Sequence, residues 1–189
     1  MKLSTAASLD PPDSVPAVDS GMARAALEAQ FDHLIAANGP ALMRLAATYT
    51  NTASDRDDLF QDIAVAVWLA LPRFRGESSE RTFLFRVAHN RAIDYLRKHR
   101  SLALNVEAEP TLADSRPSPE AGFAREQQGE RLRAAIRSLP LAHRQILSLV
   151  LEEMSYSEIA DVLGISETNV GARLNRARHL LRERMEKHK

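Results

Sequence analysis

Residues 155–181, SYSEIADVLGISETNVGARLNRARHLL, contain the signals of a helix-turn-helix. Ser155 is placed to cap a short first helix, and Glu158, three residues later, completes a capping box. Gly164 follows that helix, at the position where the departing chain needs a positive φ. Ser166 is placed to cap a second helix. One apolar stripe is expected along this second helix, formed by Val170, Leu174, Ala177 and Leu181.

The opposite side of the second helix is small and polar, with Thr168, Ala172, Asn175, Arg176 and His179. Short residues allow a helix to approach the major groove closely, and Arg and Asn side chains read base edges there. The same pattern is compatible with a solvated helix that closes an ordinary bundle. The short first helix, the Gly turn and the basic second helix together favour DNA binding.

The 25 basic and 25 acidic residues balance, but they are segregated along the chain. Basic residues gather in 81–100 and in 173–189, whereas acidic residues gather in 55–62 and 107–130. This segregation predicts two contacts with nucleic acid and at least one surface for another partner.

Composition also narrows the class of protein. The absence of cysteine excludes disulfides and thiolate metal sites. The N-terminus lacks an apolar run of signal-peptide length, and no segment approaches the length of a membrane span. We therefore expect a cytoplasmic protein that does not insert into a membrane.

Helical periodicity dominates the chain, and no stretch alternates as a half-buried strand would. We predict an all-α protein of two small helical domains joined by a flexible linker. A disordered tail is expected at 1–22, the first domain at 23–100, an acidic linker at 101–128 and the second domain at 129–189. Breaks between helices are predicted near 38–40 (Asn-Gly-Pro) and 51–52.

A long helix is expected from Thr82 to Arg100, with one apolar side and one basic side that suits a phosphate backbone. The basic side is expected to contain Arg86, His89, Asn90, Arg97 and Arg100. A polar loop precedes this helix, flanked by Phe74 and Phe83. These rings either stack on unpaired bases or belong to the core, and residue type alone favours the core.

The helix before that loop is acidic, with Asp55, Asp57, Asp58 and Asp62. The helix dipole favours carboxylates in a first turn. Four aspartates in eight residues exceed what capping needs, so a basic protein partner is a second explanation. Asp55, Asp58 and Asp62 are about one turn apart, so a metal site is a third.

Three segments resemble, in this order, the bacterial RNA polymerase sigma factors of the extracytoplasmic-function (ECF) group, which keep only the second and fourth conserved sigma domains. They are DRDDLFQDIAVAVW (55–68), FRGESSERTFLFRVAHNRAIDYLRKHR (74–100) and LPLAHRQILSLVLEEMSYSEIADVLGISETNVGARLNRARHLLRE (139–183). The resemblance covers most of 42–100 and 132–184. It implies a protein that binds core RNA polymerase and directs promoter-specific transcription initiation.

The resemblance also implies roles for individual residues. Core RNA polymerase would be bound through its coiled-coil clamp by Asp57, Asp58 and Gln61. The minus-ten promoter element would be melted and held by Gly76, Ser78, Ser79, Arg81, Phe83, Arg86, Asn90 and Arg97. The minus-thirty-five element would be read by Thr168, Asn169, Ala172, Arg173, Asn175 and Arg176. The resemblance implies an anti-sigma factor as a further partner. It implies no cofactor, no metal and no catalytic residue.

Two other functions remain open on the sequence. A stand-alone helix-turn-helix regulator explains 155–181 equally well but leaves the acidic helix and the second basic helix unexplained. An enzyme acting on DNA needs an activated nucleophile or a carboxylate metal cluster, for which only the aspartates of 55–62 are available. Binding to core polymerase separates the sigma factor from the regulator, and Mg²⁺-dependent DNA cleavage would indicate the enzyme.

Overall fold

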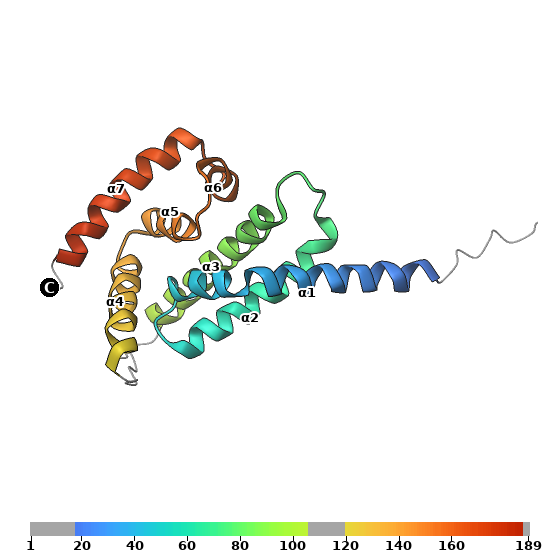
Figure 1. The fold of residues 1–189 in the computed structure, drawn as a ribbon, viewed down its shortest axis with the longest axis horizontal. Helices are drawn as coiled ribbons and strands as arrows, with labels where there is room; N and C mark the ends of the chain where they lie inside the picture. The colour runs from blue at the N-terminus through green and yellow to red at the C-terminus, as the bar shows by residue number, and fades with distance from the viewer. Residues whose placement is uncertain (1–17, 106–119, 187–189) are drawn as a thin grey trace, which may run out of the picture.

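A computed structural model describes residues 18–105 and 120–186, and these residues form helices without any strand (Figure 1). The first part contains α1 (Val18–Ala47), α2 (Ala53–Ala70), the short 3-10 helix η1 (Leu71–Arg73) and α3 (Glu80–Asn105). The second contains α4 (Glu120–Arg137), α5 (Leu141–Leu151), α6 (Tyr156–Leu163) and α7 (Glu167–Glu186). The all-α fold predicted from the sequence is confirmed.

The helices α1, α2 and α3 pack on one another and bury a shared apolar side of each. Thr52 begins α2 by accepting a hydrogen bond on Oγ1 from the Asp55 backbone N–H at 3.0 Å. Fully buried side chains from all three helices form the core of this bundle: Leu42, Leu45, Leu59, Ile63, Leu84 and Phe85. The predicted break at 51–52 is therefore confirmed.

The predicted break at 38–40 is wrong, because α1 continues through Pro40. Proline in a helix removes one backbone N–H and crowds the carbonyl four residues earlier. Pro40 and Ala36, the residue that carries this carbonyl, are both exposed, so water can replace the missing hydrogen bond. Leu34 and Leu42 lie on the buried side, and their packing holds the helix together on both sides of the proline.

The predicted helix-turn-helix is confirmed as α6 and α7. Ser155 Oγ accepts from the Glu158 backbone N–H at 3.2 Å, and Glu158 Oε2 accepts from the Ser155 backbone N–H at 2.8 Å. Gly164 has a φ of 64°, in the left-handed region that favours glycine. The expected stripe along α7 is buried at Val170, Leu174 and Ala177.

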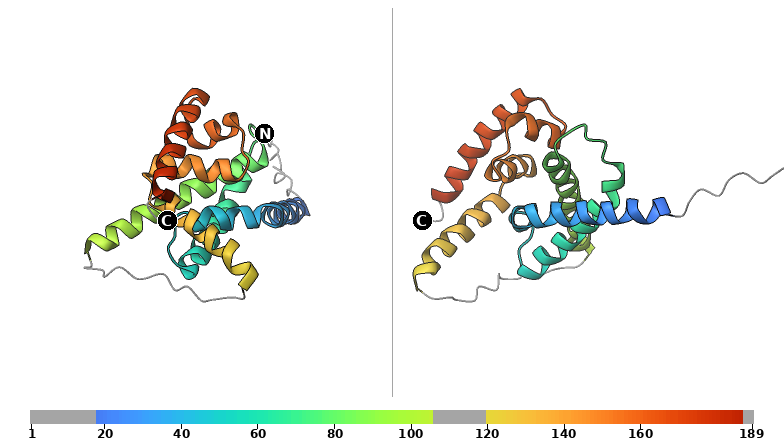
Figure 2. Two further views of the ribbon diagram at one scale, coloured as in Figure 1. Left: turned by 60° about the vertical axis from the view of Figure 1, so that its left-hand side comes forward. Right: turned by 45° about the vertical axis from the view of Figure 1, so that its right-hand side comes forward.

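The two helical parts pack against each other, and α6 contacts α3 (Figures 1 and 2). One hydrophobic cluster joins Leu42 and Phe85 of the first part to Ile146 and Ile159 of the second. Both ends of the expected linker are helical, because α3 continues to Asn105 and α4 begins at Glu120. The end of the expected tail is also helical, because α1 begins at Val18. The rest of the linker, 106–119, and of the tail, 1–17, lies outside the described residues, and the expected domain boundaries stay predictions.

His89 was expected on the basic side of α3, but it is only 1% exposed. Its Nδ1 lies 3.3 Å from the hydroxyl of buried Tyr49, and its Nε2 is buried without a protein partner. Burial lowers the pKa of His89 from 6.5 to about 4, because the apolar surroundings disfavour the imidazolium. The basic side of α3 is therefore narrower than the sequence suggested.

This burial predicts a pH-dependent stability. The unfolded chain takes up a proton on His89 near pH 6.5 and the folded chain only near pH 4, so stability falls as the pH drops through that window. The loss amounts to roughly 3 kcal/mol at most. His89→Gln keeps a hydrogen-bonding group near Tyr49 but does not titrate, so urea unfolding of the two proteins should diverge between pH 6.5 and pH 4. A constant difference in their unfolding free energies from pH 7 to pH 4 contradicts this prediction.

Candidate polymerase and nucleic-acid interfaces

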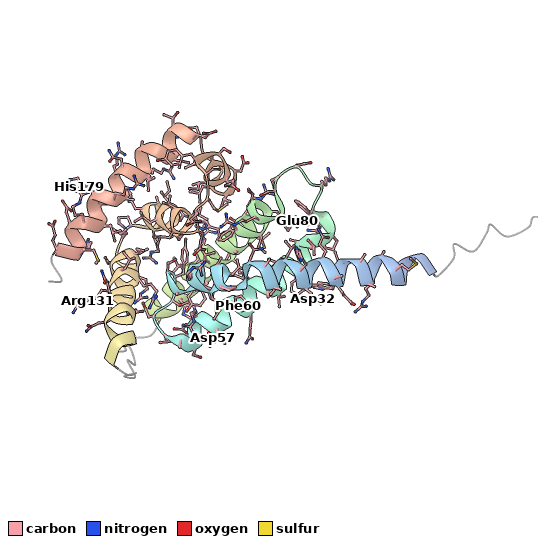
Figure 3. All side chains as sticks on the ribbon, viewed as in Figure 1. Asp32, Asp57, Phe60, Glu80, Arg131 and His179 are labelled. Atoms are coloured by element: carbon pink, nitrogen blue, oxygen red, sulfur yellow. The ribbon has the colours of Figure 1, made fainter. Side chains whose placement is uncertain are left out.

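Two acidic residues of α2, Asp57 and Asp58, lie away from the buried side of the helix. Asp57, Asp58 and Gln61 are exposed, and Asp57 forms an ion pair with the neighbouring Arg56 at 3.0 Å. The opposite side of α2 is completely buried at Leu59, Ile63 and Val67. Figure 3 shows Asp57 at the edge of the molecule away from α6 and α7. The sequence-predicted docking residues are thus free to meet another macromolecule.

This exposed side continues into two apolar residues that the sequence interpretation missed. Val65 is 58% and Leu69 is 66% exposed, and their spacing of four places the two side chains next to each other on the helix surface. With Asp58 and Asp62 they follow a spacing of four, three and four, which places all of them on one helix stripe. We call Asp58, Gln61, Asp62, Val65 and Leu69 the docking stripe. The sequence signal for Val65 and Leu69 was their spacing, which places them on the other side of the helix from the buried Leu59, Ile63 and Val67.

The described residues do not support the metal-site alternative for the aspartates of α2. Within 18–105 and 120–186, no three His, Asp or Glu side chains are placed to hold a metal ion. Asp62 instead forms an ion pair with Arg91 of α3 at 2.9 Å. Asp55 lies in the capped first turn of α2, where the helix dipole favours a carboxylate.

A cavity of about 310 Å³ lies beside the loop that precedes α3. It is lined by Arg73, Phe74, Arg75, Glu77, Ser78, Phe83 and Arg86. The two phenylalanine rings pack on each other, with centroids 4.7 Å apart. The Oγ atom of Ser78 is buried and has no hydrogen-bond partner in the protein. A small cavity with aromatic, cationic and unsatisfied polar groups is chemically suited to a nucleobase and its phosphate.

The cavity brings together three of the expected minus-ten residues, Ser78, Phe83 and Arg86. Phe83 is only 7% exposed and packs in a small apolar cluster with Leu34 and Leu71, as expected for a core residue. It also lines the cavity. Arg73 and Arg75 were missed. Both are exposed and flank Phe74, and arginines next to an aromatic residue were the sequence signal that could have identified them.

The remaining minus-ten residues lie outside the cavity lining. Asn90 and Arg97 are exposed and share one stripe of α3 with Arg86, by spacings of four and seven. Ser79 accepts a hydrogen bond on Oγ from the Thr82 backbone N–H at 3.0 Å, and Gly76 has a φ of 73° in the exposed loop. Arg81 points the other way, because its guanidinium donates to the backbone carbonyl of Glu152.

The predicted recognition surface on α7 is exposed. Thr168, Ala172, Asn175 and Arg176 are exposed on the side opposite the buried stripe, and exposed Asn169 and half-buried Arg173 lie at its flank. Ser166 caps this helix as predicted, because its Oγ accepts a hydrogen bond from the Asn169 backbone N–H at 3.3 Å. No helix in the described ranges is apolar over a length that would cross a bilayer.

Both helical parts match models of known protein families. The model of Sigma-70 region 2 matches residues 34–102, and that of Sigma-70, region 4 matches residues 129–181. The chain is similar to the RNA polymerase sigma factor NccH from Alcaligenes xylosoxydans xylosoxydans, with 32% identity over 173 residues that cover 86% of this chain and 92% of NccH. Other relatives, at 28–29% identity, are ECF RNA polymerase sigma factors.

Two solved structures resemble the whole fold. One is the structure of CnrH in complex with the cytosolic domain of CnrY, with a TM-score of 0.65, 27% identity and coverage of 86% of this chain and 91% of that one. The other is the sigma factor RpoE in complex with the anti-sigma factor NepR from Bartonella quintana. Its TM-score is 0.70 at 21% identity, and the match covers 83% of this chain and 97% of the RpoE chain. At this identity the likeness concerns the fold alone.

Proposed function

This chain belongs to the sigma-70 family and is an RNA polymerase sigma factor of the ECF group, and on that basis we propose how its surfaces act in transcription initiation. A sigma factor directs core RNA polymerase to promoters, and the family is not one of enzymes. The observation that carries the proposal is that both family regions occur in this chain and present exposed polar faces. A stand-alone regulator is not favoured, because it leaves the region 2 match unexplained.

The docking stripe of α2 binds the coiled-coil clamp of core polymerase. Asp58 and Gln61 of the stripe, with the neighbouring Asp57, supply charge and hydrogen bonds toward a basic partner. Val65 and Leu69 supply the apolar part of the same contact. An interface with an apolar centre and a charged rim is what stable protein contacts have in common. The exposure of these five residues supports this assignment.

The cavity beside α3 takes an extruded base of the minus-ten element. Phe83 and Ser78 contact the base, and Arg86, Asn90 and Arg97 follow the strand along α3. We add Arg73 and Arg75 as phosphate contacts, because they flank the cavity. Extruding a base costs a few kcal/mol, which such contacts offset without nucleotide hydrolysis. Gly76 and Ser79 shape the loop of this site, and Arg81 extends the site once its guanidinium leaves the Glu152 carbonyl.

The exposed side of α7 reads the minus-thirty-five element in the major groove. Arg176 and Asn175 contact base edges, while Thr168, Asn169, Ala172 and Arg173 permit close approach or contact phosphates. We assign residues 23–100 and 129–189 to the two sigma domains and 101–128 to the linker between them. No cofactor or catalytic residue is assigned.

An anti-sigma factor is the regulatory partner that we propose. CnrH and RpoE, which this chain resembles, were each solved as a complex with another protein, and the partner of RpoE is an anti-sigma factor. The partner would cover the docking stripe or the basic faces. We place the protein in the cytoplasm, where bacterial RNA polymerase works.

Reconstituted transcription tests the function. Core RNA polymerase alone and core with this chain are each supplied with a library of duplex fragments that contain bacterial promoters. The expected result is a set of specific transcripts that require the chain and share two sequence elements upstream of their start sites. Specific binding to duplex DNA without any chain-dependent transcript would instead indicate the stand-alone regulator.

A further inference from the structure

The N-terminal half of α1, residues 18–33, precedes the match to Sigma-70 region 2, yet it supports the cavity beside α3. Leu27 and Phe31 of this half pack against the small apolar cluster that contains Phe83. Phe74 packs against the same cluster, and its ring lies on that of Phe83. The aromatic wall of the cavity therefore rests on side chains of α1 that lie outside the matched region.

A hydrogen bond also joins this half of α1 to the start of α3. Gln30 Nε2 donates to Glu80 Oε1 at 2.7 Å, across 50 residues of sequence (Figure 3). Glu80 is the first residue of α3 and directly follows residues 74–79, which we call the cavity loop. A hydrogen bond to a carboxylate is stronger than one between neutral groups, so Gln30 holds the point where the cavity loop becomes helix.

Most of the cavity loop is exposed, so its shape depends on how its two ends are held. Its exposed residues are Arg75, Gly76, Glu77 and Ser79. An exposed segment gains little from packing, and its order therefore comes from fixed ends. The first end follows η1, whose Leu71 is buried in the apolar cluster. The second end is held by the contact between Gln30 and Glu80, together with the cap of α3.

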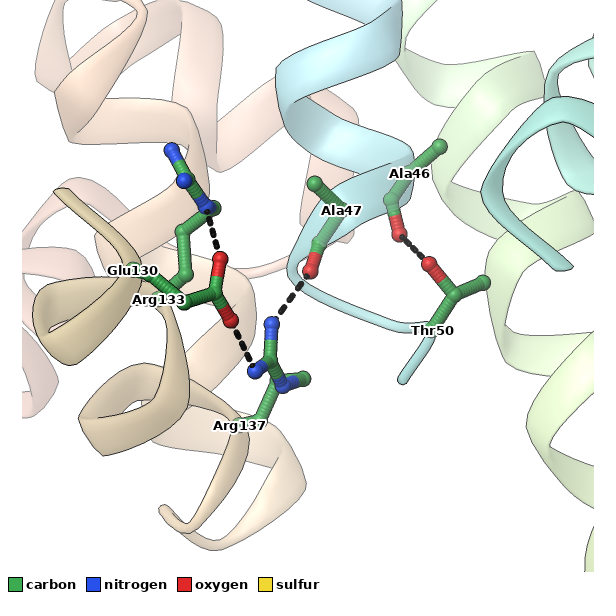
Figure 4. Close-up of polar contacts among 6 residues, drawn as sticks. All are labelled: Ala46, Ala47, Thr50, Glu130, Arg133 and Arg137. Atoms are coloured by element: carbon green, nitrogen blue, oxygen red, sulfur yellow. Dashed lines mark hydrogen bonds and ion pairs between the residues drawn. The ribbon is translucent and has the colours of Figure 1, made fainter. Parts of the chain in front are cut away.

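The helix that carries Gln30 is fixed at its other end. The carbonyls at a helix C-terminus lack helical partners, and two of them here accept side-chain hydrogen bonds. Thr50 Oγ1 donates to the carbonyl of Ala46 at 3.0 Å, and Arg137 of α4 donates to that of Ala47 at 3.2 Å (Figure 4). Because α1 is a single continuous helix, this anchored end also fixes the position of Gln30.

We propose that Gln30 is a positioning residue for the minus-ten site, an inference that rests on the proposed function. Through Glu80, Gln30 keeps the cavity loop in the arrangement that receives an extruded base. A loop that is ordered before the base arrives loses no further conformational freedom at that moment, so base capture is faster. Gln30 thereby supports promoter melting without being a DNA contact itself.

Four variants separate this hydrogen bond from the effect of charge. Gln30→Ala removes the hydrogen bond without a change of charge, and Gln30→Glu replaces it with two facing carboxylates. In the exchanged variant, Gln30→Glu with Glu80→Gln, donor and acceptor trade places, which restores the hydrogen bond and the net charge of the parent protein. Ala29→Glu is the matched control for Gln30→Glu, because Ala29 is an exposed neighbour on α1 and the substitution adds the same charge. Circular dichroism and thermal unfolding confirm that each variant is folded.

The order of the cavity loop is measured by amide hydrogen exchange in the free protein. Exchange within residues 74–83 should be faster in Gln30→Ala and in Gln30→Glu than in the parent protein, because the second end of the loop is released. The exchanged variant and Ala29→Glu should exchange at the parent rate.

Promoter melting is measured with core polymerase on a fragment that gives a chain-dependent transcript. One non-template adenine of its minus-ten element is replaced by 2-aminopurine, which fluoresces when it is unstacked. The rate of the fluorescence rise should fall about fivefold or more in Gln30→Ala and Gln30→Glu and return in the exchanged variant. Affinity for core polymerase should not change, because the docking stripe lies on α2.

Parent-like melting rates in folded Gln30→Ala and Gln30→Glu would overturn the proposal, even if loop exchange changes, because the hydrogen bond then only stabilises the loop. Melting that stays slow in the exchanged variant would also overturn it. In both cases the chain-dependent transcript still supports the proposed function. If no fragment gives such a transcript, the proposed function fails and the positioning role fails with it.

Discussion

Asp58→Arg is expected to weaken binding to core RNA polymerase by roughly 100-fold, because it places a positive charge where we propose that the docking stripe meets a basic partner. Asp58 is exposed and lies opposite the buried side of α2, so the substitution should leave the fold and its thermal unfolding unchanged. The dissociation constant is measured by titrating labelled protein with purified core polymerase at fixed ionic strength, since exposed charge pairs are screened by salt.

Asp32→Arg is the matched control for this measurement. Asp32 is also an exposed aspartate of the first domain, but it lies on α1 and outside the docking stripe, and the substitution changes the net charge by the same amount. A loss of affinity confined to Asp58→Arg assigns core binding to the stripe. Equal dissociation constants for the two variants would remove α2 from the polymerase interface.

Arg176→Ala is expected to reduce affinity for the minus-thirty-five element by about 1–3 kcal/mol and to relax the preference at one base position. Arg176 is exposed on the side of α7 that lies opposite Val170, Leu174 and Ala177, and a bidentate Arg–base contact contributes specificity of this size. The probe is the duplex that the wild-type protein, bound to core polymerase, selects from a randomised library. Each base of this duplex is then varied in turn.

Arg178→Ala provides the comparison, because Arg178 is exposed on the same helix but two positions further on, about 200° around its axis. Its loss should lower affinity nearly equally for all sequences, as the loss of a phosphate contact or of general positive charge does. If both variants lose affinity without any change in base preference, Arg176 does not read a base.

The helix-turn-helix was predictable because all its signals are local. Ser155, Glu158, Gly164 and Ser166 act within one turn of the residues they cap, so the chain near each of them is enough to place a helix end. The exposed faces of α2 and α7 were predictable for the same reason, since apolar periodicity assigns one side of each helix to the core. The outward placement of Asp58 and Arg176 follows from that assignment.

Predictions failed where a residue's environment depended on another helix. Pro40 lies within α1 because the packing of Leu34 and Leu42 outweighs the lost hydrogen bond. His89 is buried because Tyr49, forty residues away in sequence, lies beside it. Arg73 and Arg75 carry only the weak local signal of flanking Phe74, and the cavity that the fold forms between them and Arg86 is what identifies them.

Most of the helices, the caps of the helix-turn-helix and the outward faces of α2 and α7 follow from the amino-acid sequence alone. These properties arise from contacts between residues a few positions apart, which a linear pattern records. The packing of the two helical parts on each other, by contrast, depends on contacts between residues far apart in the sequence. Its central contact joins Arg44 to Glu152, 108 residues apart, and no periodicity in the sequence relates two positions on separate elements.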